Sequence, residues 1–344
     1  MTDLMVSGQP ASQAAGASYQ HLLEVEDLRV EFRTLDGVAK VINGVSLHLD
    51  PGETLALLGE SGSGKSVTAQ TIMGILDSPP AFVTGGAIRF RGTNLLTMSR
   101  EERRQVRGEG IAMIFQDALS ALNPVFTVGF QIAELFRKRR GMSRADAMRR
   151  AAELLDMVRI PNAKQRVKAY PHEFSGGMRQ RVMIAMALAL DPEILIADEP
   201  TTALDVTVQA QIMELLAELR RERNMGLILI THDLGVVADV ADRIAVMYAG
   251  RIVEEAGVFD LYRRPCHPYT KALLNSIPRL DLKGQRLNTI KGLPPSLLRI
   301  PPGCAFHPRC SLAQDICQRE LPPLRELAAG RASACHFAEE LNRD

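Results

Sequence analysis

The sequence has no apolar run that could cross a lipid bilayer. Its longest uninterrupted run, Val182 to Leu190, has nine residues, whereas a membrane-spanning helix needs about 20. The formal net charge at pH 7 is only +1, so we expect no overall electrostatic attraction to nucleic acid. Residues 1–20 are small and polar, with Asp3 and no basic start followed by an apolar block. We therefore expect a disordered tail there, and no secretory signal.

The composition is otherwise ordinary for a soluble globular protein, with 46% hydrophobic and 24% charged residues. A length of 344 residues is enough for more than one hydrophobic core. Composition therefore agrees with many functions, and the motifs must decide among them.

A glycine-rich loop between residues 59 and 66 has the pattern G-x-x-x-x-G-K-S, which cradles phosphate groups. Glycines let the backbone wind tightly, so that N–H groups and the following helix N-terminus point at an anion. Thr54 to Leu58 predicts a buried strand that enters the loop, and Val67 to Leu76 predicts a helix that leaves it. We expect Lys65 to reach the β- and γ-phosphates and the Ser66 hydroxyl to bind Mg²⁺. The expected nucleotide-binding residues of this phosphate loop are Gly59, Ser61, Gly62, Ser63, Gly64, Lys65 and Ser66.

A second motif is the apolar run from Ile194 to Ala197, which ends in two acids, Asp198 and Glu199. Such a run suits a parallel strand that is buried on both faces. Burying two carboxylates is costly unless a cation or a reacting group accepts them. We therefore expect Asp198 to hold Mg²⁺ and Glu199 to polarise the attacking water. The alternative is a strand whose acidic end meets solvent.

Between these two motifs lies the segment Phe174 to Gln180, and with all three in this order the chain resembles an ATP-binding cassette (ABC) ATPase. The match runs from about Leu23 to Arg251, with every motif in the family order. The resemblance implies an α/β fold, namely a P-loop NTPase cassette with an antiparallel β subdomain, an inserted helical subdomain and a C-terminal extension. The implied boundaries are a tail at 1–20, the ATPase domain at 21–255 with its helical subdomain at about 118–175, and the extension at 256–344.

The resemblance also assigns roles beyond the first two motifs. Gln116 matches the glutamine loop, which in the family senses Mg²⁺ or water and faces the membrane partner. Ser175, Gly176 and Gly177 look like the signature motif, which binds the phosphates of an ATP held by the opposite subunit. A helix N-terminus with small residues suits this chemistry, because backbone N–H groups can approach an anion closely.

Three further residues match family positions. Asp205 matches the loop that crosses the dimer interface, His232 matches the switch histidine, and Phe32 is placed like the aromatic that stacks on adenine. The resemblance thus implies a catalytic set of Glu199, His232 and Gln116, and a Mg²⁺ shell of Ser66, Gln116 and Asp198. Each assignment has an alternative. Gln116 could be a surface polar residue, and His232 a histidine with satisfied hydrogen bonds. Asp205 could only cap the helix that begins near Val206, and Phe32 could be a core residue.

Local signals predict several elements. Asp36-Gly37 is typical of a hairpin turn. Ser143 with Asp146 three residues later predicts a capping box that opens a helix over Arg144 to Val158, within the helical subdomain. The basic run at 137–140 is typical of a solvated helix end and not of a nucleic-acid site.

After Arg251 the resemblance narrows to one subfamily. The segments Arg264 to Leu274 and Gly303 to Cys310 look like the extension of oligopeptide, dipeptide and nickel importers. The signature segment is especially similar to the "D" subunits, since their "F" partners usually carry Gln at the position of Met178. The resemblance implies a distinct "F"-type ATPase subunit, two transmembrane permeases and an extracytoplasmic binding protein as partners. It places the chain peripherally on the cytoplasmic face of the inner membrane, with peptides, nickel or glutathione as possible cargo.

Four of the five cysteines fall in the extension, at Cys304, Cys310, Cys317 and Cys335. We expect a reducing compartment, where clustered thiolates indicate a metal more often than disulfides. Members resembling this subfamily can hold a [4Fe-4S] cluster there. The alternatives are zinc, with His307 and His336 as possible further ligands, and plain buried thiols. The fifth cysteine, Cys266, is expected to be a small hydrophobic residue.

Two other function classes occur among proteins with these motifs. Soluble ABC ATPases that act on nucleic acid or ribosomes carry long insertions or two cassettes, whereas Lys65 to Asp198 contains one compact helical insert. A non-catalytic regulatory cassette would carry another residue in place of Glu199 or His232, and this chain has both residues. The sequence therefore favours an ATP-hydrolysing subunit of a peptide importer, with ATP and Mg²⁺ as ligands and no nucleic-acid partner.

Overall fold

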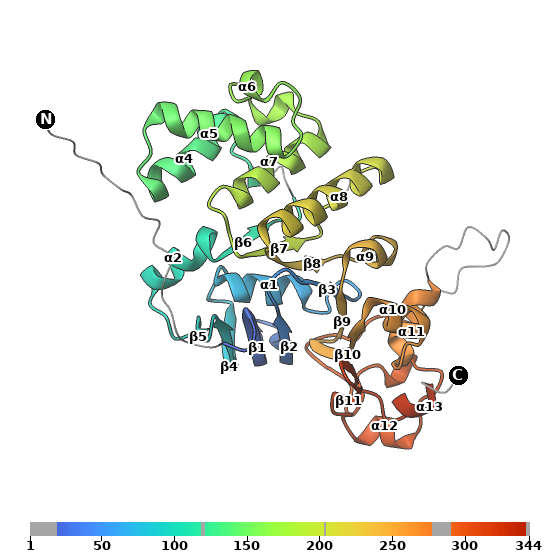
Figure 1. Ribbon diagram of the computed structural model, residues 1–344. Helices are drawn as coiled ribbons and strands as arrows, with labels where there is room; N and C mark the ends of the chain where they lie inside the picture. Colours follow the sequence, from blue (N-terminus) through green and yellow to red (C-terminus); the bar gives the residue numbers. More distant parts are fainter. Residues whose placement is uncertain (1–18, 118–120, 203, 277–289, 342–344) are drawn as a thin grey trace, which may run out of the picture.

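The computed structural model describes residues 19–117, 121–202, 204–276 and 290–341. The tail expected at 1–20 therefore lies outside the described residues except for its last two. Within the described residues, helical segments gather at one end, and the C-terminal extension lies at the other (Figure 1). None of the helices in these ranges is long and apolar enough to cross a membrane.

An eight-stranded sheet, in the order β11-β12-β10-β9-β3-β8-β7-β6, forms the centre of the described chain. Strands β9, β3, β8, β7 and β6 run parallel to one another, whereas β10 pairs antiparallel with β9. Every residue of β3, β6, β7 and β8 is buried, as expected for apolar runs covered on both faces. The strands are β3 (Thr54–Leu58), β6 (Ile111–Ile114), β7 (Ile194–Asp198), β8 (Gly226–Ile230), β9 (Arg243–Tyr248), β10 (Arg251–Gly257), β11 (Arg325–Ala328) and β12 (Arg331–Ser333).

A separate antiparallel sheet has the order β2-β1-β4-β5. The hairpin expected at Asp36-Gly37 is confirmed, because Thr34 pairs with Gly37 across the turn between β1 and β2. Alternate residues of β3 face opposite sides: Leu55 and Leu57 pack in a core with the antiparallel strands and α1, whereas Ala56 and Leu58 join the core under the other helices. The bounds are β1 (Leu23–Thr34), β2 (Gly37–Leu49), β4 (Ala81–Phe90), β5 (Thr93–Asn94) and α1 (Lys65–Met73).

Helices α4, α5, α6 and α7 make up the helical part inserted between β6 and β7 (Figure 1). Half of the capping box predicted for α5 is confirmed, since the Ser143 hydroxyl accepts the N–H of Asp146 at 3.1 Å. The Asp146 carboxylate does not complete the box, because it accepts from the Ser143 hydroxyl at 2.7 Å. The basic run at 137–140 does end a helix, and Gly141 follows it in the left-handed conformation that ends helices. The bounds are α4 (Val128–Arg140), α5 (Arg144–Met157), α6 (Ala163–Arg166), α7 (Gly176–Leu188), and, outside this part, α2 (Arg100–Glu109), α8 (Val206–Arg223) and α9 (Leu234–Val240).

The C-terminal extension is joined to the cassette through the central sheet. Strand β12 pairs with β10, through Glu254 opposite Ser333 and Glu255 opposite Ala332. Strand pairing therefore joins the extension to β10, which lies mostly on the cassette side of the boundary expected at 255. Its remaining elements are α10 (Val258–Arg263), α11 (Pro268–Asn275), the 3-10 helix η2 (His307–Arg309), α12 (Asp315–Arg319) and α13 (Ala338–Leu341).

Candidate functional site

The phosphate loop leaves β3 and enters α1, in the predicted order. The predicted bounds of Val67 to Leu76 are wrong, because α1 begins at Lys65 and ends at Met73, where Gly74 takes the left-handed conformation that ends helices. Two glycines of the loop are required by their surroundings. Gly59 has φ 149°, and a Cβ atom there would lie 2.3 Å from the carbonyl oxygen of Met247. Gly64 has φ 108°, and its Cβ would lie 2.8 Å from the carbonyl oxygen of Val41. A side chain at either position would both strain the backbone and collide with a neighbouring strand.

Lys65 lies inside the loop, with its side chain turned back along it. Its Nζ donates to the carbonyl oxygens of Gly59 at 2.7 Å and Glu60 at 3.0 Å. The residue is 5% exposed, and this burial lowers the pKa of its ammonium group, although the nearby carboxylates of Glu199 and Asp198 oppose the shift. The loop carbonyls therefore hold a cation at the place where phosphate oxygens are expected.

The two expected Mg²⁺ ligands on the phosphate loop and on β7 lie in contact. The Ser66 hydroxyl donates to Asp198 Oδ1 at 3.0 Å. Asp198 is 4% exposed, and burial raises the pKa of its carboxyl group. A hydroxyl and a carboxylate held together at a phosphate loop are the oxygen ligands that Mg²⁺ prefers, so these residues fit the ion.

Glu199 lies where three side chains converge. The amide nitrogen of Gln116 donates to its Oε2 at 2.9 Å, and the Thr202 hydroxyl donates to the same oxygen at 3.0 Å. Nδ1 of His232 lies 3.4 Å from its Oε1. Glu199 has φ 47°, an uncommon conformation for a residue other than glycine. The structure therefore brings Gln116, Glu199 and His232 together, and it adds Thr202, which no sequence motif indicated.

The signature residues and Asp205 lie at the starts of two neighbouring helices. The Ser175 hydroxyl accepts the N–H of Met178 at 3.3 Å and caps α7. The Asp205 carboxylate accepts the N–H of Val208 at 3.0 Å and caps α8, so the capping role weighed for Asp205 is present. A Cβ atom on Gly177 would lie 2.6 Å from Cγ1 of Val208, so this glycine allows the two helix starts to pack together.

These two helix starts are not part of the phosphate-loop cluster. Among the described residues, no hydrogen bond or ion pair joins Ser175, Gly176 or Gly177 to the loop at 59–66. Phe32 lies on β1, half-buried, and packs at the margin of the core between the two sheets. Its expected contact with adenine stays a prediction.

The four cysteines of the extension line one cavity, together with Phe306, His307, His336 and Phe337 among others. Cys317 and Cys335 are buried, and Cys304 and Cys310 are partly buried. The backbone N–H of Cys304 donates to the carbonyl oxygen of Cys317 at 2.8 Å. Segments distant in sequence therefore bring the thiols around a common space. Cys266 is fully buried, as predicted, and lies outside this lining. It is not purely hydrophobic, however, because its Sγ accepts a hydrogen bond from the Arg331 guanidinium at 2.8 Å.

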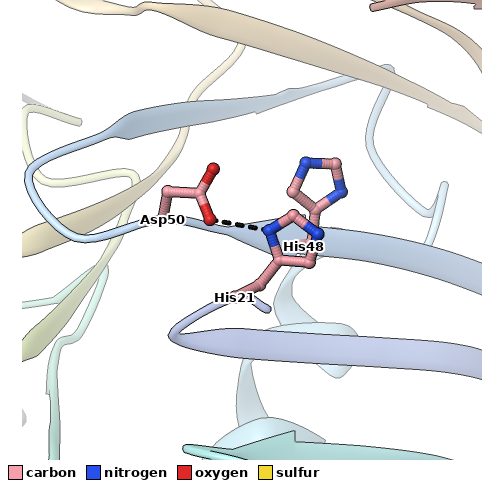
Figure 2. A group of neighbouring side chains, drawn as sticks. All are labelled: His21, His48 and Asp50. Carbon is pink, nitrogen blue, oxygen red and sulfur yellow. Dashed lines mark hydrogen bonds and ion pairs between the residues drawn. The ribbon is translucent and has the colours of Figure 1, made fainter. Parts of the chain in front are cut away.

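A different group of possible metal ligands lies at the ends of β1 and β2. Within the described ranges, His21, His48 and Asp50 form the one group of three whose ligand atoms all fall within 4.8 Å of one another. Figure 2 shows the Nδ1 of His21 directed at the Asp50 carboxylate, a contact of 2.7 Å. The rings of His21 and His48 lie 4.0 Å apart between centroids. Ring packing and a charge-assisted hydrogen bond are sufficient to explain this group, which joins the ends of two strands.

Comparison with known proteins identifies the chain's relatives. The ABC transporter family model matches residues 42–202, and the model of the oligopeptide/dipeptide transporter C-terminal region matches residues 253–317. The oligopeptide transport ATP-binding protein OppD of Salmonella typhimurium is 53% identical over 314 residues, which cover 91% of this chain and 93% of that protein. The chain belongs to the oligopeptide/dipeptide ABC transporter family of ATP-binding proteins.

Other members of the family are similarly close. The dipeptide transport ATP-binding protein DppD of Bacillus subtilis is 52% identical over 303 residues, covering 88% of this chain and 90% of that protein. Among solved structures, the dimeric bacterial ABC transporter cassette MJ0796 has a TM-score of 0.61 at 28% identity. The match covers 69% of this chain and 98% of the MJ0796 chain. The expected α/β cassette fold is therefore confirmed, and the chain is an ABC ATPase.

Proposed function

We propose that this chain hydrolyses ATP to power the import of di- and oligopeptides across the cytoplasmic membrane. The observation that carries the proposal is the convergence of Gln116, Thr202 and His232 on Glu199, beside the contact between Ser66 and Asp198. The assignment of peptides as the substrate rests on the relatives, because two of them are named as oligopeptide and dipeptide transport proteins.

The roles of the site residues follow from their chemistry. The loop N–H groups and Lys65 bind the phosphates, and Ser66, Asp198 and Gln116 would hold Mg²⁺, which would neutralise phosphate charge. Glu199 accepts a proton from the attacking water, and a carboxylate that already accepts two hydrogen bonds is well oriented to do so. His232 lies on the other side of the same carboxylate and is positioned to contact the γ-phosphate. Phe32 stacks on adenine in this proposal.

The signature residues act on a nucleotide bound to a second subunit. Supporting this, Ser175 and Gly176 are exposed at the start of α7 and take no part in the chain's own phosphate-loop cluster. Asp205, exposed at the start of α8, faces the same interface. We assign the second subunit to a distinct "F"-type ATPase, and add two permeases and an extracytoplasmic binding protein. The chain then lies peripherally on the cytoplasmic face of the membrane.

The cysteines of the extension hold a metal group, for which a [4Fe-4S] cluster is our assignment. Four thiols line one cavity, which suits all-cysteine ligation. Zinc needs ligands about 3.8 Å apart, since its bonds to sulfur are about 2.3 Å long. Among the described residues, no three thiols or imidazoles of this cavity have ligand atoms within 4.8 Å of one another. A cluster of four irons does not need its thiolates so close together, and for this reason we assign the cluster and not zinc.

Transport by the assembled complex tests the proposed function. The full chain is reconstituted in liposomes with its partner ATPase, its two permeases and its binding protein, and uptake of a labelled peptide mixture is followed with and without ATP. We expect ATP-dependent peptide uptake. Uptake of nickel or glutathione with no peptide uptake would overturn the substrate assignment, and hydrolysis of ATP with no uptake of any of the three would overturn the transport assignment.

A further inference from the structure

Glu60, inside the phosphate loop, is held by two residues of the C-terminal extension. Its backbone N–H donates to the Tyr269 hydroxyl at 2.8 Å. Its two carboxylate oxygens accept from the Arg309 guanidinium, at 2.5 Å and 2.8 Å. Its carbonyl oxygen accepts from Nζ of Lys65 at 3.0 Å. One loop residue is therefore bonded to the extension on one side and to the phosphate-binding lysine on the other.

The pair of Arg309 and Glu60 is built to keep a fixed geometry. The Arg309 side chain is 5% exposed and that of Glu60 is 23% exposed. The two parallel hydrogen bonds to Glu60 raise the pKa of Arg309 still further, so the guanidinium stays charged. Its Nε donates to the carbonyl oxygen of Lys291 at 3.1 Å, and its Nη1 lies 3.3 Å from the Tyr248 hydroxyl. A bidentate pair that is largely removed from water is costly to break, because each partner would be left as a desolvated charge.

Arg309 is also part of the turn that carries two of the cysteines. The N–H of His307 donates to the carbonyl oxygen of Cys304 at 2.9 Å, and the N–H of Cys310 donates to that of His307 at 3.2 Å. The backbone N–H of Arg309 donates to the carbonyl oxygen of Phe306 at 2.9 Å. These bonds make residues 304–310 one compact turn, in which Cys310 is the next residue after Arg309.

The same turn is packed against the residue that binds the Glu60 backbone. The Phe306 ring lies 5.3 Å from the ring of Tyr269 and 5.3 Å from that of Tyr248, between centroids. Phe306 is 3% exposed and Tyr269 is fully buried. A shift of the cysteine turn would therefore move both groups that hold Glu60, since packed aromatic side chains have little room to adjust independently.

We propose that Arg309 and Tyr269 are positioning residues for the phosphate loop, and that they couple the cysteine site to nucleotide binding. When the cysteine site holds its metal group, the turn is fixed and Glu60 keeps the loop in its binding shape. When the site is empty or its cysteines are lost, the turn relaxes and nucleotide binds more weakly. The coupling half of this inference rests on the proposed metal site, whereas the positioning half needs only the contacts to Glu60.

Coupling between two sites is reciprocal, so nucleotide must also stabilise the cysteine site. Bound nucleotide fixes the phosphate loop, the loop fixes Glu60, and Glu60 fixes the turn through Arg309. The reciprocal effect gives a measurement that does not depend on hydrolysis.

The positioning role is tested by the dissociation constant of Mg-ATP for the full chain. Arg309→Gln and Tyr269→Phe should each raise this constant about fivefold to tenfold, the lower part of the usual range for coupled sites. Arg309→Lys keeps the positive charge but cannot make two parallel hydrogen bonds, so its dissociation constant should lie between those of wild type and Arg309→Gln. The control is Arg319→Gln, an exposed residue of α12 two positions from Cys317, which should bind as wild type does.

A double-mutant cycle separates positioning from general loss of structure. Glu60→Gln should weaken binding about as much as Arg309→Gln, and the double variant should be no weaker than either, because all three remove the same contact. Thermal unfolding without nucleotide confirms that each variant is folded. Binding by the folded Arg309→Gln and Tyr269→Phe variants that equals wild type would overturn the positioning role, as would full additivity in the cycle.

The coupling is tested by iodoacetamide labelling of Cys304 and Cys310, followed residue by residue with mass spectrometry. Saturation with Mg-AMP-PNP should slow labelling about fivefold in wild type, and should have no such effect in Arg309→Gln. Equal rates with and without nucleotide in wild type would refute the coupling. Metal content of the same preparation is measured separately. Absence of metal overturns both the cluster assignment and its coupling to nucleotide binding, whereas the positioning role of Arg309 and Tyr269 is still decided by the dissociation constants.

Discussion

The side-chain amide of Gln116 lies 2.9 Å from the carboxylate of Glu199, although 83 residues separate them in the chain. The contact follows from the sheet, because β6 and β7 are parallel neighbours and Ile114 pairs with Ala197. Each of the two residues comes two positions after that pair, at the carboxyl edge of the sheet. Ligand sites in open α/β sheets form at this edge, and here it places a proton acceptor beside the phosphate loop.

The first prediction concerns Glu199 as the proton acceptor. Glu199→Gln keeps the size of the side chain and its ability to accept from Gln116, and removes its basicity. We expect ATP to bind as in wild type and its hydrolysis to slow about 100-fold or more, the usual contribution of a general base. Binding is measured by calorimetry and hydrolysis by phosphate release in the assembled transporter. Glu222→Gln, an exposed change on α8, is the control. If Glu199→Gln hydrolyses ATP at the wild-type rate, Glu199 is not the proton acceptor.

The local motifs of the nucleotide site could be read from the sequence because each depends on neighbours in the chain. The strand at Thr54–Leu58 has the predicted bounds, and the helix predicted over Arg144 to Val158 ends one residue earlier, at Met157. Apolar runs, a capping serine and a glycine pattern are sufficient for such elements. The convergence of Gln116 and His232 on Glu199 was implied only by the family resemblance.

The contacts that join the extension to the cassette could not be read in this way. Arg309 and Glu60 are 249 residues apart, and neither belongs to a motif that requires the other. The pairing of β12 with β10 likewise depends on the return of a distant segment. Thr202 shows the same limit on a smaller scale, since a threonine after two acids has no distinctive spacing. Long-range partners of this kind are set by the packed fold and not by local pattern.

The second prediction uses the close packing of α7 against α8. Gly177→Ala would place a methyl group 2.6 Å from Cγ1 of Val208, closer than carbon atoms can approach, so we expect the variant to lose about 1–3 kcal/mol of unfolding free energy. Gly176→Ala is the matched control, because its methyl group would meet Leu204 at an ordinary 3.5 Å. Urea unfolding of the two variants measures the difference. Equal stability would show that the two helix starts adjust freely.

The third prediction concerns the metal of the extension. Cys310→Ser replaces one cavity-lining thiol, and we expect protein purified without oxygen to lose most of its iron, because a hydroxyl is a poor ligand for iron–sulfur clusters. Cys266→Ala is the control, since Cys266 lies outside the cavity lining and its loss should leave the metal in place. Elemental analysis and the visible absorption spectrum are the measurements. If the wild-type protein contains neither iron nor zinc, the assignment of a metal site to these cysteines is wrong. If it contains zinc alone, the site binds zinc and not an iron–sulfur cluster.

A buried histidine gives the extension a specific sensitivity to acid. His267 is 1% exposed, and its Nδ1 accepts the N–H of Tyr269 at 3.1 Å, which caps α11. Burial lowers its pKa from the ordinary 6.5 to about 3. The folded protein therefore keeps this ring neutral, whereas the unfolded chain binds a proton below pH 6.5. The stability contributed by the neutral ring is full above pH 6.5, and is lost progressively as the pH falls toward 3.

The fourth prediction is that His267→Asn makes the protein less sensitive to acid. Asparagine is a good helix cap and does not titrate, so the variant should avoid the loss of about 2 kcal/mol that His267 causes at pH 5 relative to pH 8. The measurement is the change in unfolding free energy between these two pH values. The carboxyl of Glu254, whose pKa burial raises to about 6, is present in both proteins, so its contribution largely cancels. His172→Asn, an exposed control, should follow wild type. The same pH dependence in His267→Asn as in wild type would mean that His267 is protonated in the folded state.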